Sequence, residues 1–316
     1  MTESRGEWAL IDWIRRRAGG DANAVPIGPG DDMACVRIGP TDCLLTTDTL
    51  LEGTHFDLAQ ATPRQVGYKA MAVSLSDCAA MAAEPVAAVA WVGLPEDRPM
   101  AFAEALTAGL LEAGERFACP LVGGDVTSWA GGLVIGTTVL ARTGDGPPVR
   151  RGGARPGDIL LVTGTLGGSL LGRHLDFTPR VAEARCLAAA AHLHAMIDLS
   201  DGLSTDLGHV CTESGVGAEV EAEAVPVSDD ARRLSERDGR SALDHALSDG
   251  EDFELLVAVS ADDAARLARE RPLGPLPLTP VGRVVEGRGV NLVEPDGSHR
   301  PLEPGGYEHF RGGDSA

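Results

Sequence analysis

A glycine turn at Gly28-Pro29-Gly30 delivers two adjacent carboxylates, Asp31 and Asp32, to the start of an apolar run over 33–38. Neighbouring residues on a strand point to opposite faces, so only one of the two can face a given site, and the other is free to cap the turn or face a second site. Acidic clusters recur beside Gly, Ser or Thr at Thr46-Thr47-Asp48, Asp77, Gly123-Gly124-Asp125, Asp198-Leu199-Ser200-Asp201 and Gly250-Glu251-Asp252. This recurrence predicts a fold in which the clusters converge on several divalent ions.

The order of apolar runs and amphipathic stretches predicts an α+β protein, and 316 residues favour two domains. The N-terminal domain, 1–145, is expected to form a mixed sheet with helices on one face. Its strands are predicted at 33–38, 43–47, 85–94, 120–122 and 132–142, and its helices at 7–17, 62–81 and 99–117. The sequence Thr62-Pro63-Arg64-Gln65 is typical of a helix start, with Thr as the N-cap and Gln completing a capping box.

A linker rich in Gly, Pro and Arg, at 143–156, leads into a C-terminal α/β domain, 146–316. Strands are predicted at 158–163, 196–198, 253–259 and near Val281 and Val290, and helices after 169, after 201 and at 261–269. The glycine turn from Gly164 to Ser169 stands between a strand and a helix, where backbone N–H groups can hold an anion.

The charge balance limits the possible partners. A formal net charge of −20 argues against a nucleic-acid backbone or an anionic membrane, since both would be repelled at long range. The six cysteines are scattered without a C-x-x-C pair, which favours reduced thiols over disulfides or a zinc site. No apolar run approaches the ~20 residues of a membrane helix, and the N-terminus lacks the apolar core of a signal peptide. A cytoplasmic location is therefore expected.

The candidate ligands point to magnesium. The chain has no Walker A loop, no H-R-D catalytic loop, no G-x-S-x-G elbow and no H-E-x-x-H helix. Oxygen ligands without clustered Cys or His suit magnesium, which keeps waters and shares its shell with substrate phosphates. The candidates are Asp32, Thr46, Thr47, Asp48, Asp77, Asp125, Asp198 and Asp201. Each cluster alone also fits ordinary turn chemistry, because Asp beside Gly hydrogen-bonds locally in turns.

Lys69 is the only lysine among 27 basic residues. A genome biased toward arginine codons would explain the composition, whereas a need for a flexible ammonium at this position is the alternative. On the predicted helix, Lys69 precedes Asp77 by two turns, too far for the direct pairing seen at one-turn spacing. It can still supply positive charge near that carboxylate.

Seven motifs, taken in order, resemble the thiamine-monophosphate kinase family, and the likeness runs from about Gly6 to Phe310. They are Gly28-Pro29-Gly30-Asp31-Asp32, Thr46-Thr47-Asp48-Thr49-Leu50 with His55-Phe56, Tyr68-Lys69-Ala70 through Ser76-Asp77, Gly123-Gly124-Asp125, Arg151-Gly152-Gly153-Ala154-Arg155-Pro156-Gly157-Asp158, Ile197-Asp198-Leu199-Ser200-Asp201-Gly202-Leu203 and Gly250-Glu251-Asp252-Phe253-Glu254. The same superfamily includes aminoimidazole ribonucleotide synthetase.

The resemblance implies an aminoimidazole ribonucleotide synthetase-like fold, a homodimer formed through the N-terminal sheets, and transfer of phosphate from ATP to thiamine phosphate. By the same likeness, magnesium ions would be held by Asp32, Thr46, Thr47, Asp48, Asp77, Asp125, Asp198 and Asp201. ATP would be contacted by Gly124, Asp125, Arg151 and Ser200. The thiamine substrate would be contacted by His55 and Glu251, with Tyr307 as a substitute for an aromatic residue that the family can place near its C-terminus.

The implied reaction agrees with the residues. A phosphate oxygen is already ionised at neutral pH, so the nucleophile needs no strong general base. The difficulty is to bring two anions together, which metal ions relieve by neutralising charge and fixing an in-line approach. Arg151 is expected to add a fixed fork for ATP phosphate. Two alternatives stay open: another ATP-dependent enzyme of the superfamily, acting on a purine precursor, and a non-catalytic nucleotide- or metal-binding protein.

Overall fold

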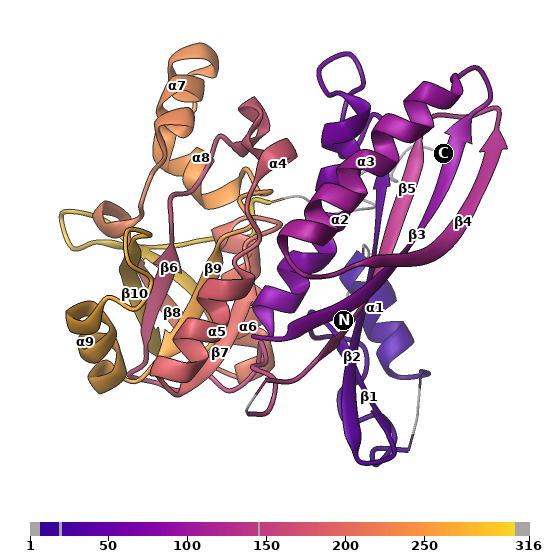
Figure 1. Cartoon of the computed structure of the whole chain (residues 1–316). Helices are drawn as coiled ribbons and strands as arrows, with labels where there is room; N and C mark the ends of the chain where they lie inside the picture. The colour runs from indigo at the N-terminus through magenta and orange to yellow at the C-terminus, as the bar shows by residue number, and fades with distance from the viewer. Residues whose placement is uncertain (1–6, 19–20, 145, 307–316) are drawn as a thin grey trace.

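Two β-sheets, each with helices packed on it, lie side by side in the computed structural model, which describes residues 7–18, 21–144 and 146–306 (Figure 1). The first sheet contains β1 (Ala34–Ile38), β2 (Thr41–Leu51), β3 (Glu84–Pro95), β4 (Leu121–Trp129) and β5 (Val134–Arg142). Its strand order is β1-β2-β5-β3-β4, with β3 and β4 parallel and the other neighbours antiparallel. The expected mixed sheet is therefore present.

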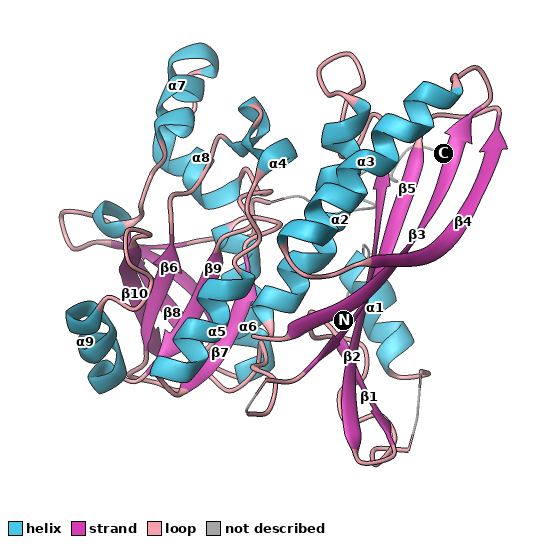
Figure 2. Cartoon of the chain, in the orientation of Figure 1, coloured by secondary structure: helices cyan, strands magenta, loops and turns pink. Residues whose placement is uncertain are grey.

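Helix α2 (Pro63–Ala80) stands between the two sheets (Figure 2). Its start has the predicted capping box, in which Thr62 Oγ1 accepts the Gln65 N–H at 3.3 Å and the Gln65 side chain reaches back to the Thr62 N–H. Helix α3 (Met100–Arg116) covers the same face of the first sheet, and α1 (Glu7–Arg15) precedes the sheet in sequence. A single core cluster runs from the first sheet through α2 to one face of the second sheet, so the two halves share a hydrophobic core.

The second sheet has the order β12-β11-β8-β10-β6-β9-β7, in which only β8 and β11 pair in parallel. Its strands are β6 (Ile159–Thr163), β7 (Leu193–Asp198), β8 (Gly217–Glu221), β9 (Leu255–Val259), β10 (Leu278–Val285), β11 (Gly289–Val293) and β12 (His299–Pro301). Its helices are α4 (Arg173–Asp176), α5 (Val181–Ala190), α6 (Leu203–Ser214), α7 (Asp229–Asp238), α8 (Ala242–Ser248) and α9 (Ala261–Glu270), with 3₁₀ turns at Ser169–Leu171 and Ala222–Ala224. A second core cluster joins the other face of this sheet to α6 and α8.

Several strands are longer than predicted, such as β2, which continues past the predicted 43–47 to Leu51, and two elements differ more deeply. The strand predicted at 120–122 does not end before the Gly-Gly-Asp motif, since β4 continues through it to Trp129. Gly124 permits this, because a Cβ there would lie 1.8 Å from the Ala90 carbonyl oxygen of the paired strand β3. The glycine turn at 164–169 leads only into a 3₁₀ turn and the four-residue α4, which are separated by Gly172 with a φ of +132°.

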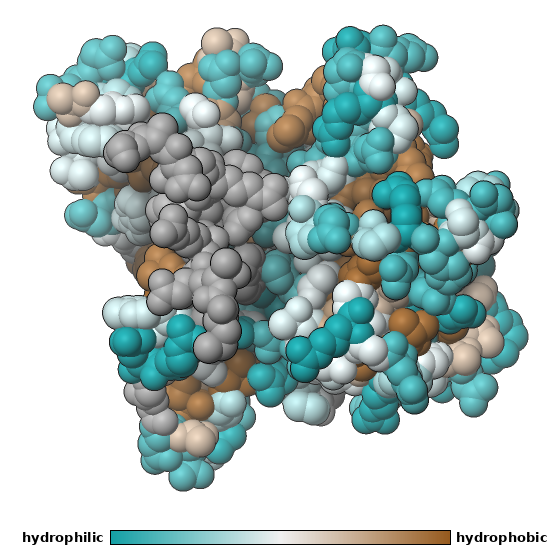
Figure 3. All heavy atoms as spheres, turned by 180° about the vertical axis from the view of Figure 1, so that it is seen from behind, coloured by the Kyte–Doolittle hydropathy of each residue, from teal (hydrophilic) through white to brown (hydrophobic). Residues whose placement is uncertain are grey.

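Hydrophilic residues dominate the back of the molecule, with hydrophobic residues exposed among them (Figure 3). Within the described residues, no helix combines the length and the apolar character needed to cross a membrane.

Helices α2 and α3 cross with their backbones in close contact at a glycine pair. A Cβ at Gly67 would lie 1.9 Å from the Leu106 carbonyl oxygen, and one at Gly109 would lie 1.9 Å from the Arg64 carbonyl oxygen. Gly67→Ala should therefore lower the free energy of unfolding by about 1–3 kcal/mol through overpacking. Urea denaturation measures the change. Gly144→Ala is the control, since nothing lies within 4 Å of its added Cβ, and an equal effect of the two would contradict the crossing.

Candidate active site

Three carboxylates from distant parts of the chain meet where the two sheets adjoin. Asp32 follows the glycine turn before β1, Asp77 lies in the last turn of α2, and Asp198 is the final residue of β7. One oxygen of each lies within 4.8 Å of the others. We call these three residues the acidic site. The structure thus brings together predicted ligands from both halves of the chain.

Hydroxyl groups hold the carboxylates of this region in place. Ser76 Oγ, one residue before Asp77 on α2, donates to Asp198 Oδ2 at 2.6 Å. Thr46 Oγ1 of β2 donates to Asp77 Oδ2. Two residues further along β2, Asp48 accepts a hydrogen bond from Ser74 Oγ at 2.6 Å. Strand alternation explains why both Thr46 and Asp48 contact α2, because residues two apart on β2 share the face that meets this helix.

Burial makes the ionised forms of these acids costly. The pKa of Asp77 lies well above its ordinary value, chiefly because burial disfavours the charge, and Asp48, Asp198 and Asp32 add repulsion. Burial also raises the pKa of Asp198 to about 7, with the charge of Asp32 as the next cause. The pKa values of Asp32 and Asp48 are raised by burial too, although Arg151 opposes the rise at Asp32. The acids therefore need more positive charge than one guanidinium supplies.

The acidic site suits a hard divalent cation. All its ligand atoms are carboxylate oxygens, the donors that magnesium prefers. Asp32 Oδ2 is buried and has no hydrogen-bond partner within the described ranges. An unsatisfied buried oxygen is uncommon, and an ion bound there would satisfy it.

A second group lies at the start of α6 and comprises Asp201, Asp206 and His209, whose ligand atoms are also within 4.8 Å of one another. Asp206 accepts the N–H groups of Asp201 and Gly202 at 3.1 and 3.0 Å, so it holds the turn that follows β7. Burial, with Arg151 and Arg15 nearby, lowers the pKa of His209 to about 3, which keeps the ring neutral. Sequence reasoning identified only Asp201. The signal for the other two was the i, i+3 spacing of Asp206 and His209, which puts both on one face of α6.

Two predicted ligands lie on the other face of the first sheet. Thr47 alternates with Thr46 and Asp48, and its hydroxyl donates to the Thr137 carbonyl oxygen at 3.1 Å. Asp125 on the edge strand β4 is exposed and pairs in register with Trp91 of β3, whose neighbours Ala90 and Val92 face the helices. The structure does not bring the Thr47 hydroxyl or the Asp125 carboxylate to the acidic site.

The linker after the first sheet approaches the acidic site through two arginines. Arg151 Nη2 donates to Asp32 Oδ1 at 2.6 Å, whereas Arg150 Nε donates to Asp31 Oδ2 at 3.0 Å. Asp31 also accepts the Arg151 N–H at 3.1 Å, so the two adjacent acids hold the linker at separate points. Ser200 lies between Asp198 and Asp201 and accepts the Glu251 N–H on its carbonyl oxygen at 2.7 Å. Tyr307 and the rest of 307–316 lie outside the described residues.

Lys69 joins the two residues expected at the thiamine substrate. Its Nζ donates to Glu251 Oε1 and to the His55 carbonyl oxygen, both at 2.6 Å, and its side chain is fully buried. The positive charge of Lys69, expected near Asp77, is thus paired with Glu251 instead. Eight residues of helix separate Lys69 from Asp77 by roughly 12 Å, which is too far for direct pairing. Sequence reasoning missed the pairing because Glu251 lies 182 residues away in the chain.

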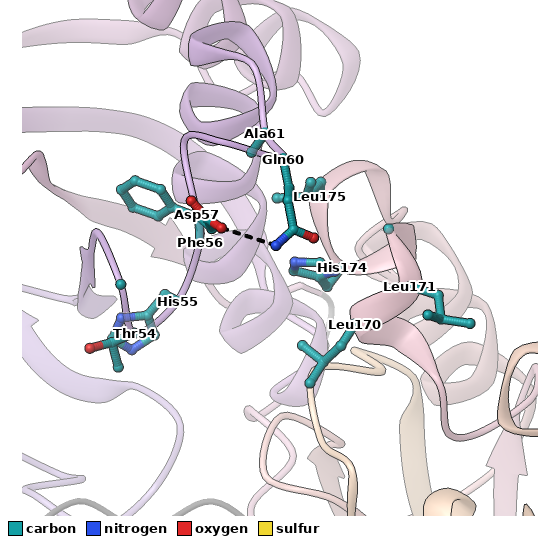
Figure 4. Close-up of a pocket in the computed structure, with 12 residues that line it drawn as sticks. Thr54, His55, Phe56, Asp57, Gln60, Ala61, Leu170, Leu171, His174 and Leu175 are labelled. Carbon is teal, nitrogen blue, oxygen red and sulfur yellow. Dashed lines mark hydrogen bonds between the residues drawn. The ribbon is translucent and has the colours of Figure 1, made fainter. Parts of the chain in front are cut away.

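A cavity of about 280 Å³ opens beside His55, between the loop after β2 and the segment that contains α4 (Figure 4). One wall contains Thr54, His55, Phe56, Asp57, Gln60 and Ala61, and the other contains Leu170, Leu171, His174 and Leu175. His174 Nδ1 donates to the Ser169 carbonyl oxygen at 2.9 Å, so Nε2 of the neutral ring is an acceptor. Burial, followed by the charge of Lys69, lowers the pKa of His174.

The glycine turn at 164–169 already holds anions, and they belong to the protein. Gly167 N–H donates to both carboxylate oxygens of Asp252 at 3.0 and 2.9 Å, and Gly168 N–H donates to Asp249 at 3.0 Å. These backbone groups therefore anchor the loop around Glu251 instead of offering a site for phosphate.

Comparison with known proteins places this geometry in a family. Residues 30–143 match the family described as AIR synthase related protein, N-terminal domain, and residues 155–294 match AIR synthase related protein, C-terminal domain. The thiamine-monophosphate kinase of Rhodopirellula baltica is 38% identical over 296 residues, which cover 90% of this chain and 92% of the relative. The chain belongs to the thiamine-monophosphate kinase family. The thiamine-monophosphate kinase of Salmonella typhimurium is 37% identical over 331 residues, which cover 96% and 98% of the two chains.

A solved structure of this kinase family shares the whole fold. AaThiL complexed with AMPPCP and TMP superposes with a TM-score of 0.83 at 33% identity and covers 98% of this chain and 100% of its own. The family resemblance and the α+β fold of two AIR synthase-related domains, both predicted from the sequence, are confirmed. The chain is an enzyme of the kinase class.

If the acidic site binds Mg²⁺, the cation should stabilise the protein. Burial and like charges raise the folded-state pKa of Asp77, so its ionisation destabilises the fold at pH 8, where unfolded Asp is fully charged. Asp77→Asn should therefore raise the thermal midpoint in EDTA and reduce the rise that Mg²⁺ causes. For the wild type, Mg²⁺ at a hundred times its Kd would add about 2.7 kcal/mol.

Differential scanning fluorimetry with EDTA or Mg²⁺ measures both effects. Asp97→Asn is the matched control, because its side chain is 82% exposed and should leave both midpoints unchanged. Equal Mg²⁺-induced rises in the wild type and Asp77→Asn would contradict the cation site.

Proposed function

We propose that this enzyme transfers the γ-phosphate of ATP to thiamine monophosphate and yields ADP and thiamine diphosphate, as a cytoplasmic step of thiamine diphosphate biosynthesis. The observation that carries the proposal is the acidic site, in which both halves of the chain supply carboxylates. Relatives that match the chain almost end to end are called thiamine-monophosphate kinase, and AaThiL was solved with AMPPCP and TMP.

In this proposal the acidic site and Asp48 would hold several magnesium ions, with Thr46 and Asp201 beside them. The ions would neutralise charge between two phosphates and favour a direct in-line transfer. The chain needs no general base, since the attacking phosphate oxygen is already ionised. The side chains of the protein would position the reactants: hydroxyls such as that of Ser76 hold the carboxylates in place. The Arg151 guanidinium, which contacts Asp32, would bind ATP together with Ser200.

The thiamine end of the acceptor would occupy the cavity beside His55, close to Glu251. The cavity has apolar side chains at Leu170 and Leu175 and an acceptor nitrogen at His174, features suited to a heteroaromatic ring with an amino group. Whether Tyr307 also covers that ring stays a prediction. In this arrangement the N-terminal domain, 1–145, supplies most metal ligands, and the C-terminal domain, 146–316, supplies the other wall of the acceptor site.

A homodimer is part of the proposal. The face of the first sheet opposite α2 and α3 exposes apolar side chains, namely Leu45, Leu51, Val89, Trp91 and Leu140. Association of two such faces would bury them, and it would place Asp125 and Gly124, the other expected ATP contacts, at or beside the interface. Asp125 and Thr47 could then act across the interface or through their backbone atoms.

Val89→Glu should weaken the proposed dimer at least tenfold, since it places a charge at the centre of the apolar face. Sedimentation equilibrium of the purified protein measures the association constant. Met100→Glu on α3, which is 75% exposed and away from this face, should leave association unchanged. A monomeric wild type, or a dimer that tolerates Val89→Glu, would refute this interface.

The reaction itself is tested by mass spectrometry of a mixture of protein, ATP, Mg²⁺ and thiamine monophosphate. Thiamine diphosphate should form with Mg²⁺ and not with EDTA. Asp48→Asn should reduce kcat by roughly 10²-fold or more while the fold stays intact, because it removes charge that the metal requires. Near-normal turnover by a folded Asp48→Asn would exclude the proposed metal site. No product from folded, ATP-binding wild type would favour a sister enzyme of the superfamily or a binding protein.

A further inference from the structure

The contact between Lys69 and Glu251 joins the two domains inside the protein. Lys69 lies on α2, and Glu251 lies in the turn between α8 and β9. The Lys69 side chain is completely buried, so its charge is tolerated only because two oxygens accept from it at 2.6 Å. The ammonium is therefore committed to Glu251 and to the carbonyl of His55.

The backbone around Glu251 is held on both sides. Its N–H donates to the Ser200 carbonyl oxygen at 2.7 Å, and its own carbonyl oxygen accepts from Ser169 Oγ at 2.6 Å. Its φ of +53° is unusual for a residue with a side chain, and such conformations persist only where the surroundings fix them. The surroundings thus fix both the backbone and one side-chain oxygen of Glu251.

Among the described residues, the second carboxylate oxygen of Glu251, Oε2, lacks the contacts that fix the first. Oε2 is buried and has no hydrogen-bond partner in the part of the chain that the structure describes. A buried carboxylate oxygen without a donor costs free energy, and its presence in a turn otherwise well satisfied indicates that a donor arrives from outside. Lys69 Nζ bridges the other oxygen of this carboxylate to the carbonyl oxygen of His55, a residue that lines the cavity, so Oε2 lies behind that wall of the cavity.

We propose that Lys69 is a positioning residue for the acceptor substrate: it orients Glu251 so that Oε2 accepts a hydrogen bond from the amino group of the aminopyrimidine ring, and it fixes the His55 loop. This inference rests on the proposed thiamine-monophosphate kinase activity. One ammonium thereby sets both sides of the acceptor site, one from each domain.

The geometry also explains why arginine could not replace lysine at position 69. An ammonium is a compact point charge on a flexible stem, whereas a guanidinium is larger and planar. The buried space around Nζ has to admit two acceptors at 2.6 Å, and a guanidinium would displace one of them. The only lysine among 27 basic residues therefore stands at a position that requires that shape.

The experiment compares steady-state kinetics of the wild type, Lys69→Met and Lys69→Arg. Both variants should raise KM for thiamine monophosphate at least tenfold and leave KM for MgATP within about twofold. Calorimetry without ATP should show the same loss of thiamine monophosphate affinity. The matched control is Arg64→Met on the same helix, whose exposed guanidinium pairs with Glu112 at 2.7 Å and whose loss should change neither constant.

A second variant separates positioning from a structural tie between the domains. Lys69→Met leaves the partly buried carboxylate of Glu251 without its cation, and Lys69→Met/Glu251→Leu removes both charges and should recover the thermal midpoint. Under the proposal, this double variant keeps the raised KM for thiamine monophosphate, since the acceptor oxygen is gone. Under a purely structural role, KM returns to the wild-type value together with the midpoint, and that result would overturn the inference.

A substrate analogue tests the hydrogen bond directly. The analogue of thiamine monophosphate with oxygen in place of the amino group should bind the wild type at least tenfold more weakly than thiamine monophosphate, and the difference should vanish in the double variant. Equal discrimination in both proteins would also overturn the inference. Wild type that forms no thiamine diphosphate would refute the proposed function, whereas normal wild-type turnover with unchanged KM in the Lys69 variants would refute only the role of Lys69.

Discussion

Repulsion among buried carboxylates is the constraint around which this structure is arranged. Asp32, Asp77 and Asp198 come within 4.8 Å of one another with Asp48 nearby, and burial raises the pKa of each. A fold driven by stability alone would separate them. The protein instead fixes them with hydroxyls and one arginine, which leaves a site whose negative charge a divalent cation can offset.

Helix α2 provides the packing that offsets the repulsion among these carboxylates. It packs against the first sheet, α3 and the near face of the second sheet, so a single hydrophobic core supports the carboxylates on both sides. Glycine at 67 and 109 lets the backbones of α2 and α3 pack in close contact. Near the end of α2, Asp77 belongs to the acidic site, Ser76 contacts it through Asp198, and Ser74 holds the neighbouring Asp48. Lys69, two turns earlier, reaches Glu251. One rigid element thus sets the positions of groups from both domains.

Much of this arrangement is predictable from local sequence. The capping box at Thr62 and Gln65 predicts the start of α2, and the recurring acidic clusters beside Gly, Ser or Thr indicate that carboxylates converge. Local pattern fails where tertiary contacts decide the outcome. The Gly-Gly-Asp motif is typical of a turn, but pairing with β3 extends it as an edge strand. Thr47 groups with its neighbours in sequence, although strand alternation turns its hydroxyl to the other face. The partner of Lys69 is hidden by a sequence separation of 182 residues, which no periodicity reveals.

The spacing along α2 links the two halves of the site. From Lys69 to Asp77 the helix rises roughly 12 Å. Helix α2 therefore sets the distance between Glu251, which would bind the ring, and the acidic site, which would bind the phosphates. In the proposed function, an acceptor that contacts both Glu251 and the acidic site would lie extended along the helix, with its phosphate at the carboxylates. A shorter phosphate ester could engage only one end, and would lose either the ring contacts or the alignment for transfer. Under the proposed function, selectivity for the acceptor would follow from the length of this buried helix as much as from any single contact.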